Sequence, residues 1–136
     1  MHETFDHTAD VGLRVRAPDL PTIFDEAGAA LFTVIAGDLS SIRRTDEVPF
    51  RIESTYYDYL LFDWLSELLF AFESRRLLLA EFDVSLSNMA LSATARGETY
   101  DPSRHQLEHE VKAITYHGLK LERAGKEWVA EVIVDI

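Results

Sequence analysis

The chain has 136 residues, of which 47% are hydrophobic and 27% charged; this length and composition suit a single folded domain, 1–136, and exclude a disordered chain. The absence of cysteine excludes disulfides and cysteine-ligated zinc, and the N-terminal residues show no basic region followed by an apolar run, so a cytoplasmic location is expected. The formal net charge of −11 disfavours direct contact with nucleic-acid phosphates, so a function on RNA would need a basic protein partner, and simple solubility is the alternative meaning of this charge.

Polar and ionisable residues gather at positions 6–10, immediately before a strand-like alternation. Apolar side chains at Val11, Leu13 and Val15 would share one face of that strand. At the start of a strand a rigid scaffold can hold a carboxylate such as that of Asp10, but aspartate is equally common there as a turn former. The residues alone leave both interpretations open.

Two later segments have the periodicity of helices. The first begins near Asp19, a predicted N-cap, and ends at Gly37. The second covers residues 57–74, with Ser54 or Thr55 as its predicted cap. It is apolar on most sides, which predicts a buried core helix, with an interface for a partner helix as the alternative. Because its apolar length falls short of the ~20 residues that cross a bilayer, no membrane association is expected.

The remaining segments alternate in the manner of strands, with a predicted hairpin turn at Ser87 and Asn88. The predicted strands after the first helix cover residues 45–53, 81–86, 89–95, 110–117 and 128–136, and Leu119 and Leu121 are expected to extend the strand at 110–117. Pro49 cannot donate a ladder hydrogen bond, which predicts an edge strand or a bulge. The pattern predicts an α+β domain in which two helices pack on a largely antiparallel sheet of about seven strands.

The last two residues, Asp135 and Ile136, belong to an apolar strand that must be buried on one face, so the carboxyl group of Ile136 is expected to be held in place. If Asp10 lies beside them, carboxylates converge, and two like charges ~4 Å apart repel by about 4 kcal/mol at an effective dielectric constant of 20. A shared proton, a lysine or a bound cation would each offset this repulsion. Oxygen ligands select hard cations such as Ca²⁺, Mg²⁺ or Mn²⁺.

The histidines give a weaker signal. His105 and His109 have the i, i+4 spacing of some helical metal sites, but no glutamate follows the first of them, which favours a structural or merely exposed role. His117 follows the alternation of its strand and is expected to line it. His7 is expected to orient Asp10 rather than to bind a metal itself.

Four stretches of the chain together resemble the archease family. They read HTADVG at 7–12, GETYD at 97–101 with His105 after it, EVKAITYH at 110–117, and VDI at 134–136. Their order and spacing resemble the family over the whole chain.

The resemblance implies an archease-like fold and a divalent metal site. Its ligands would correspond to Asp10, Asp135 and the carboxylate of Ile136, and the cation would be Ca²⁺, Mg²⁺ or Mn²⁺. Lys112 corresponds to the essential lysine of the family. Asp101 and His105, like His7, are expected to lie beside the metal ligands or to face a partner.

The resemblance also implies an accessory function. Archeases assist the RtcB-type RNA ligase in tRNA splicing and RNA repair: they promote guanylylation of the catalytic histidine of the ligase, restore its repeated turnover and broaden its nucleotide choice beyond GTP. The expectation is therefore a non-catalytic activator with an RNA ligase as its partner. Two alternatives stay open, a metal-dependent phosphoesterase and a general chaperone or scaffold that uses the apolar second helix and no metal.

Overall fold

The computed structural model describes residues 1–7 and 10–136, with side chains described at 1–4 and 10–136. Within these residues the chain forms eight strands, two α-helices and one short 3-10 helix. In chain order they are β1 (His2–His7), β2 (Asp10–Ala17), α1 (Leu20–Ala36), η1 (Leu39–Ser41), β3 (Asp46–Glu53), α2 (Tyr57–Arg75), β4 (Leu77–Ser87), β5 (Ala90–Thr99), β6 (Ala113–Ile114), β7 (Lys120–Ala124) and β8 (Glu127–Asp135).

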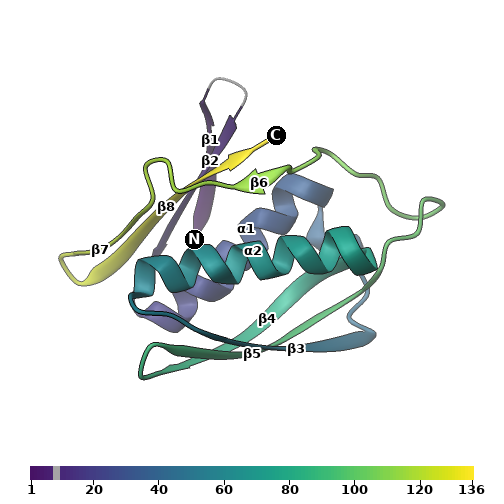
Figure 1. Ribbon diagram of the computed structural model, residues 1–136. Helices are drawn as coiled ribbons and strands as arrows, with labels where there is room; N and C mark the ends of the chain where they lie inside the picture. Colours follow the sequence, from purple (N-terminus) through teal and green to yellow (C-terminus); the bar gives the residue numbers. More distant parts are fainter. Residues whose placement is uncertain (8–9) are drawn as a thin grey trace.

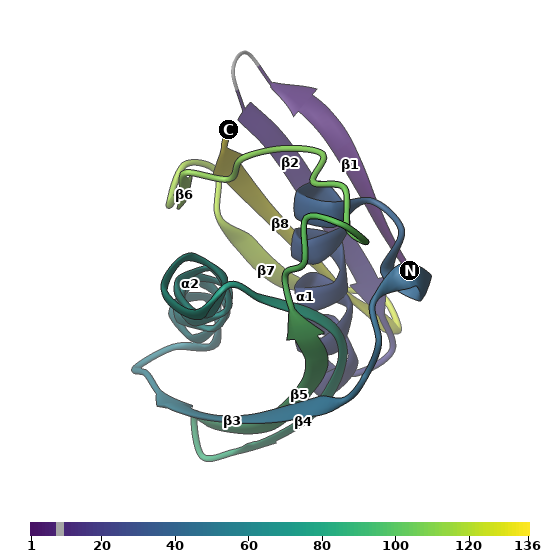
Figure 2. The same ribbon diagram turned by 90° about the vertical axis from the view of Figure 1, so that its right-hand side faces the viewer.

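The strands form two antiparallel sheets, with the helices between them (Figures 1 and 2). The five-stranded sheet has the order β1-β2-β8-β6, with β7 also paired to β8, and the three-stranded sheet has the order β3-β5-β4. Helix α1 contacts β2 of the first sheet and β4 of the second, and α2 also contacts strands of both. The predicted α+β class is confirmed, but the prediction of one sheet is wrong, because alternation shows which side chains share a face and not which strands pair.

Helix α1 begins and ends where the sequence predicts. Asp19 is the N-cap, and its carboxylate accepts a hydrogen bond from the backbone N–H of Thr22 at 2.9 Å. Gly37 is the C-cap, with a φ of 77° that an L side chain rarely adopts, and its N–H donates to the Thr33 carbonyl.

Helix α2 differs from its prediction at its start and on its surface. Tyr56 is the N-cap and makes no side-chain capping hydrogen bond, so the predicted cap at Ser54 or Thr55 is wrong. Eight residues between Leu60 and Phe72 are buried, which confirms a core helix, but Tyr59 and Phe70 are exposed. The helix is therefore apolar toward the core and also carries aromatic rings toward solvent.

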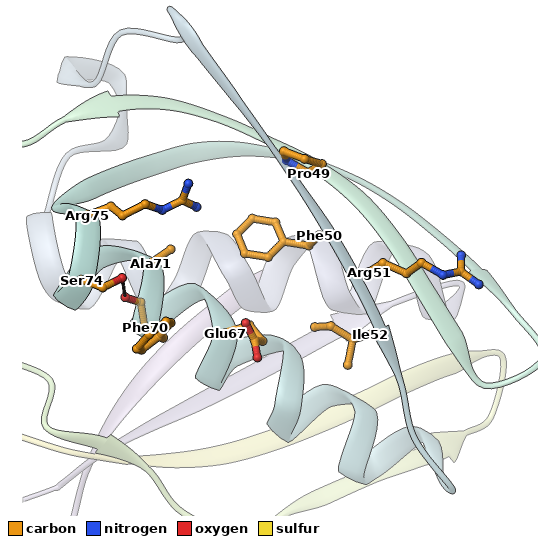
Figure 3. A pocket seen from close by; sticks show the side chains of 9 residues that line it. All are labelled: Pro49, Phe50, Arg51, Ile52, Glu67, Phe70, Ala71, Ser74 and Arg75. Atoms are coloured by element: carbon orange, nitrogen blue, oxygen red, sulfur yellow. Dashed lines mark hydrogen bonds between the residues drawn. The ribbon is translucent and has the colours of Figure 1, made fainter.

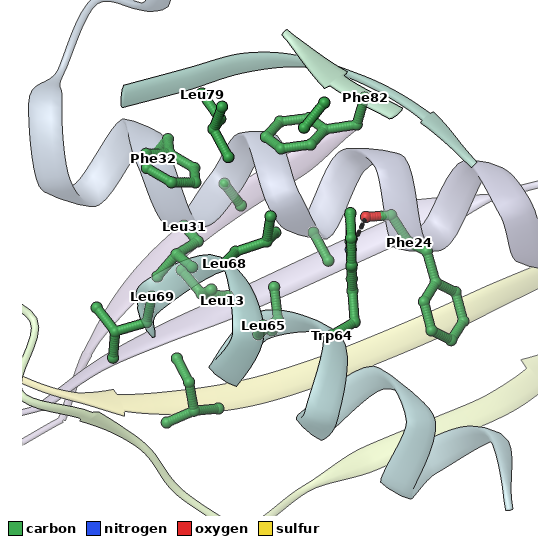
Figure 4. Packing of buried hydrophobic residues seen from close by; sticks show 14 of the residues in the cluster. Leu13, Phe24, Leu31, Phe32, Trp64, Leu65, Leu68, Leu69, Leu79 and Phe82 are labelled. Carbon is green, nitrogen blue, oxygen red and sulfur yellow. Dashed lines mark hydrogen bonds between the residues drawn. The ribbon is translucent and has the colours of Figure 1, made fainter. Parts of the chain in front are cut away.

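The core lies where both helices meet the two sheets (Figure 4). Trp64 of α2 is fully buried, and its indole N–H donates to the carbonyl of Phe24 in α1 at 2.8 Å, which satisfies a polar group inside the core. The Phe82 ring of β4 stacks on Phe32 and meets Trp64 edge to face. Each such side chain contributes roughly 1.5–3 kcal/mol by its burial, before its loss of conformational entropy is counted.

Several strand predictions need correction. Residues 2–7 form β1, which the sequence analysis missed because a mostly polar edge strand has little apolar alternation. Of the predicted strand 110–117, only Ala113–Ile114 pairs, as β6, and of its predicted extension Leu121 lies in a separate strand, β7. The hairpin turn lies at Asn88 and Met89, both with positive φ, and not at Ser87 and Asn88. Pro49 lies in β3, an edge strand, as predicted.

The part of the chain that the structure describes contains no helix with the length and apolar content needed to cross a membrane.

Candidate functional site

Asp10 and Asp135 lie directly opposite each other. Asp10 is the first residue of β2, Asp135 is the last residue of β8, and the two are register partners in the antiparallel pair. Directly opposed residues in such a pair project to the same face with their Cβ atoms ~4.5–5.5 Å apart, so the two carboxylates leave the sheet side by side. The chain thus brings together two acids separated by more than a hundred residues.

These donors suit a hard cation. Like charges directly opposite each other destabilise a sheet, and a divalent ion between them would remove that cost. Among the described residues no group of three or more His, Cys, Asp or Glu side chains is placed to hold a metal. Ile136, whose carboxyl group is the third predicted ligand, follows Asp135 directly. The fit is to Ca²⁺, Mg²⁺ or Mn²⁺ and not to zinc or copper.

Ile136 is half-buried against the core and borders a hollow of about 310 Å³. The other lining residues are Thr4, Val11, Thr33, Val34, Gly37, Glu108 and His109. Glu108 reaches this place because its N–H donates to the Ile35 carbonyl at 2.8 Å, where α1 is ending. The sequence analysis missed Glu108, since no periodicity marks an irregular segment that follows a helix end.

Lys112 lies at the same strand end. Its backbone N–H donates to the Asp135 carbonyl at 2.7 Å, and the next residue, Ala113, is the register partner of Asp135. The Lys112 side chain is exposed. An ammonium group is therefore available within the reach of a lysine side chain from the two aspartates.

Asp101 and His105 belong to a different cluster, which surrounds Glu98. His105 is buried; its Nδ1 accepts the backbone N–H of Asp101 at 2.8 Å, and its Nε2 lies 3.0 Å from Glu98 Oε2. An accepting Nδ1 places the proton of a neutral ring on Nε2, where it is donated to Glu98. The Asp101 carboxylate accepts hydrogen bonds from the N–H and hydroxyl of Ser103. Burial supports the structural role considered for His105.

Glu98 is the centre of that cluster. Its Oε2 accepts the backbone N–H of Arg43 at 2.6 Å, and its Oε1 pairs with the Arg104 guanidinium. Burial raises the pKa of Glu98, but the hydrogen bonds from Arg43 and His105 and the Arg104 charge outweigh it, so the pKa lies below its ordinary value. The cluster ties the loop after β5 to the segment before β3.

Gly97 explains how Glu98 reaches this position. A Cβ atom on Gly97 would lie 1.8 Å from the carbonyl oxygen of Leu78, so only glycine allows the two strands to approach this closely. The ladder between β4 and β5 shifts its register at the same place, between Leu79 and Glu81. Strand β5 continues through Gly97 to Thr99.

Another hollow, of about 320 Å³, lies between β3 and α2 (Figure 3). Arg51 and Arg75 lie toward opposite ends of it, with Glu67 between them. Ser74 directs its hydroxyl to the Phe70 carbonyl of its own helix at 2.6 Å. These lining residues show neither paired acids nor a nucleophile next to a base, so the strand end remains the stronger candidate site.

The His7 side chain lies outside the described residues, and its predicted role at Asp10 stays a prediction. His117 is exposed, beyond the end of β6. His109 is exposed and borders the hollow beside Ile136.

Comparisons with known proteins agree in one family. The model of the archease protein family (MTH1598/TM1083) matches residues 2–136. The archease of Methanopyrus kandleri is 40% identical to this chain, with 98% of each chain covered, and that of Sulfurisphaera tokodaii is 34% identical, with 98% of this chain and 97% of that one covered.

Solved structures extend the agreement to the fold. The solution structure of Methanobacterium thermoautotrophicum protein 1598 is 34% identical, covers 99% of this chain and 98% of its own, and superposes with a TM-score of 0.88. The crystal structure of a Thermotoga maritima archease, described as a possible chaperone, shares the fold with a TM-score of 0.66 at 22% identity, covering 100% of this chain and 98% of its own. The chain belongs to the archease family.

Proposed function

We propose that this protein is a non-catalytic activator of an RtcB-type RNA ligase, and that it acts through a divalent cation held by Asp10, Asp135 and the carboxyl group of Ile136. The observation that carries the proposal is the direct opposition of Asp10 and Asp135 across β2 and β8. An acid pair of this kind lowers the stability of a sheet unless something compensates it. Membership in the archease family makes an accessory role the leading hypothesis.

The residues at the strand end would act by positioning charge. The two aspartates hold the cation, which when bound supplies positive charge to phosphate oxygens. Lys112, anchored by its N–H to the Asp135 carbonyl, has an exposed side chain and would supply an ammonium group near the same strand end. Together they would align a nucleotide phosphate in the pocket of the ligase, a contribution of orientation and electrostatics of the kind that dominates phosphoryl transfer.

The charge of the chain favours a protein partner over RNA. A net charge of −11 repels phosphate backbones but attracts the basic surface of an RNA-binding enzyme and raises its rate of association. The role proposed here is therefore to adjust the active site of the ligase, while the RNA is held by the ligase itself. A cytoplasmic location fits this role and stays a prediction.

Multiple-turnover ligation with the cognate ligase tests the proposal. Asp10→Asn and Asp135→Asn remove the paired charge and keep the shape, and we expect each to lower the stimulated rate by about tenfold to a hundredfold, the range seen when the surroundings of a metal are changed. Asp46→Asn is the matched control, because Asp46 is exposed in β3 of the other sheet. Unchanged stimulation by both variants would reject the proposed role.

A second assay separates this function from the two alternatives. Hydrolysis of RNA or nucleotides by the isolated protein with Mn²⁺ would favour a phosphoesterase. Protection of unfolded clients from aggregation that is indifferent to a chelator and to Asp10→Asn would favour a chaperone. The proposal predicts neither result.

A further inference from the structure

Four aromatic rings form a continuous row on the surface where α2 meets the segment after β6. Tyr116 stacks on Phe62 with ring centres 3.8 Å apart, and Tyr59 meets Tyr116 edge to face at 6.1 Å. Tyr56 continues the row, 5.8 Å from Tyr59. Tyr56, Tyr59 and Phe62 come from one end of α2 and Tyr116 from a segment far along the chain, so the fold assembles this row.

The row is exposed to solvent although aromatic rings favour burial. The exposed fractions are 60% for Tyr56, 46% for Tyr59 and 60% for Tyr116, which makes these three of the five large exposed hydrophobic residues in the described part of the chain. Single exposed rings need no explanation, but a contiguous group marks a surface that binds something.

An acidic side chain lines a groove beside the same rings. A groove of about 530 Å³ is lined by Asp58, Tyr59, Tyr116 and Leu119. Asp63 lies four residues after Tyr59 and therefore on the same face of α2. Neither Asp58 nor Asp63 forms an ion pair among the side chains that the structure describes, 1–4 and 10–136. The groove thus combines two nearly perpendicular rings with the Asp58 carboxylate, which has no cationic partner among these side chains, and Asp63 lies on the same face of the helix.

We propose that this groove is a docking site for an arginine side chain of a protein partner. A cation is attracted to the face of an aromatic ring and to a carboxylate at once, and an apolar or anionic ligand would use only one of these features or neither. Arginine fits better than lysine, because its flat guanidinium can stack on one ring while its N–H groups reach a carboxylate. The net charge of −11 favours a partner with a basic surface.

Nucleic acid is the alternative ligand for this groove, and the negative charge of the groove disfavours it. Exposed tyrosines can stack on bases, but single-strand binding surfaces pair such rings with lysine and arginine that track the backbone. Here the charged residue lining the groove is Asp58. Phosphates would be repelled from the position where the rings are most accessible.

The groove is distinct from the strand end and is joined to it by a short path. Lys112 donates its N–H to the Asp135 carbonyl, and Thr115, the residue before Tyr116, donates its N–H to the Ile133 carbonyl at 3.0 Å. A partner that contacts Asp135 could thus also reach Tyr116 along β6. The inference requires no metal, so its failure and the failure of the proposed function can be told apart.

Titration of the ¹⁵N-labelled protein with a short blocked peptide, acetyl-Gly-Arg-Gly-amide, tests the site. We expect the largest changes in amide chemical shift at Tyr59, Tyr116 and their neighbours. A citrulline peptide of the same shape should bind about tenfold more weakly, since it lacks the charge. Asp58→Asn and Tyr116→Leu should each weaken binding by about fivefold. Tyr116→Phe keeps the ring and should stay within about twofold of the unchanged protein.

Glu73→Gln is the matched charge control, because Glu73 is an exposed acid at the other end of α2. We expect it to leave binding unchanged, and circular dichroism verifies that every variant is folded. Three outcomes would overturn the inference: equal binding of the arginine and citrulline peptides, tighter binding of a single-stranded RNA oligomer at the same residues, or self-association of the protein that Tyr116→Leu abolishes.

Discussion

Two carboxylate sites of this protein differ in what surrounds the acids. At Glu98 the carboxylate meets a backbone N–H, a histidine and a guanidinium, so the charge is satisfied from within the chain. At the end of β2 and β8 two aspartates lie opposite each other across the ladder. The first arrangement stabilises the fold by itself, whereas the second gathers two like charges, which a shared cation would stabilise. The comparison distinguishes an acid with a structural role from an acid pair that we propose to bind a cation.

The largest effect is expected at Glu98. Glu98→Ala removes the acceptor of the part-buried Arg43 N–H and of the buried His105 ring. We expect the free energy of unfolding, measured with urea, to fall by about 2–4 kcal/mol at pH 7. Added Ca²⁺ should not restore it. A loss below about 0.5 kcal/mol, the usual range for surface substitutions, would show that the cluster is not structural.

The pH dependence of stability gives a second view of Glu98. Its pKa is lowered in the folded protein, so its stabilisation is present above the ordinary value of 4.5 and is lost as the pH falls through the folded pKa. Glu98→Gln should therefore lose the part of the acid-side slope that belongs to this group. An identical slope in both proteins below pH 4.5 would contradict the hydrogen bonds described.

The second effect concerns the strand end. If Asp10 and Asp135 share a cation, Ca²⁺ at a hundredfold excess over its dissociation constant should stabilise the native protein by about 2.7 kcal/mol, seen as a higher melting temperature. Asp135→Asn should abolish this gain and, without calcium, should leave stability equal or slightly raised because a like-charge pair is removed. Asp46→Asn should behave like the unchanged protein. If Asp135→Asn keeps the stability gain from Ca²⁺, the cation binds at other residues.

The smallest effect on stability is expected at Asp25, an acid that belongs neither to the Glu98 cluster nor to the strand-end pair. Burial, with smaller contributions from Glu26, Asp83 and Glu81, raises its pKa to about 6. The folded protein therefore holds this proton more tightly than the unfolded chain, and stability falls as the pH rises from about 4 to above 6. Asp25→Asn should raise the free energy of unfolding by about 1 kcal/mol at pH 7.5 and leave it unchanged at pH 3.5. A gain of the same size at both pH values would point to a cause other than ionisation.

Local signals predicted much of this fold. Asp19 and Gly37 bound α1 because a capping carboxylate and a positive-φ residue are written in the sequence itself. The alternation at the C-terminus similarly predicts β8. The division into two sheets could not be predicted from the sequence, since a period of two identifies the faces of a strand and not its neighbouring strands. Strand β6 was overestimated because β-branched residues also occur in extended segments that have no ladder partner.

The same limit applies to predicting the candidate site from the sequence. Acids at both ends of the chain were visible, but only the resemblance to archeases suggested that Asp10 and Asp135 meet, because no local rule brings together residues this far apart in the sequence. Glu98 stood inside one of the matching motifs, yet its burial depends on Gly97 and on the loop that holds Arg104. The row formed by Tyr59 and Tyr116 was missed for the same reason: its two halves lie in distant segments that only the folded chain joins.

Anomalous diffraction from crystals of the protein soaked in Mn²⁺ tests the central claim most directly, because it locates the ion without any assay of function. The account predicts a manganese peak within coordinating distance, ~2.1–2.4 Å, of carboxylate oxygens from both Asp10 and Asp135, and its loss in Asp10→Asn. A peak bound by neither aspartate, or Asp10 and Asp135 side chains directed away from each other with no ion between them, would contradict the account.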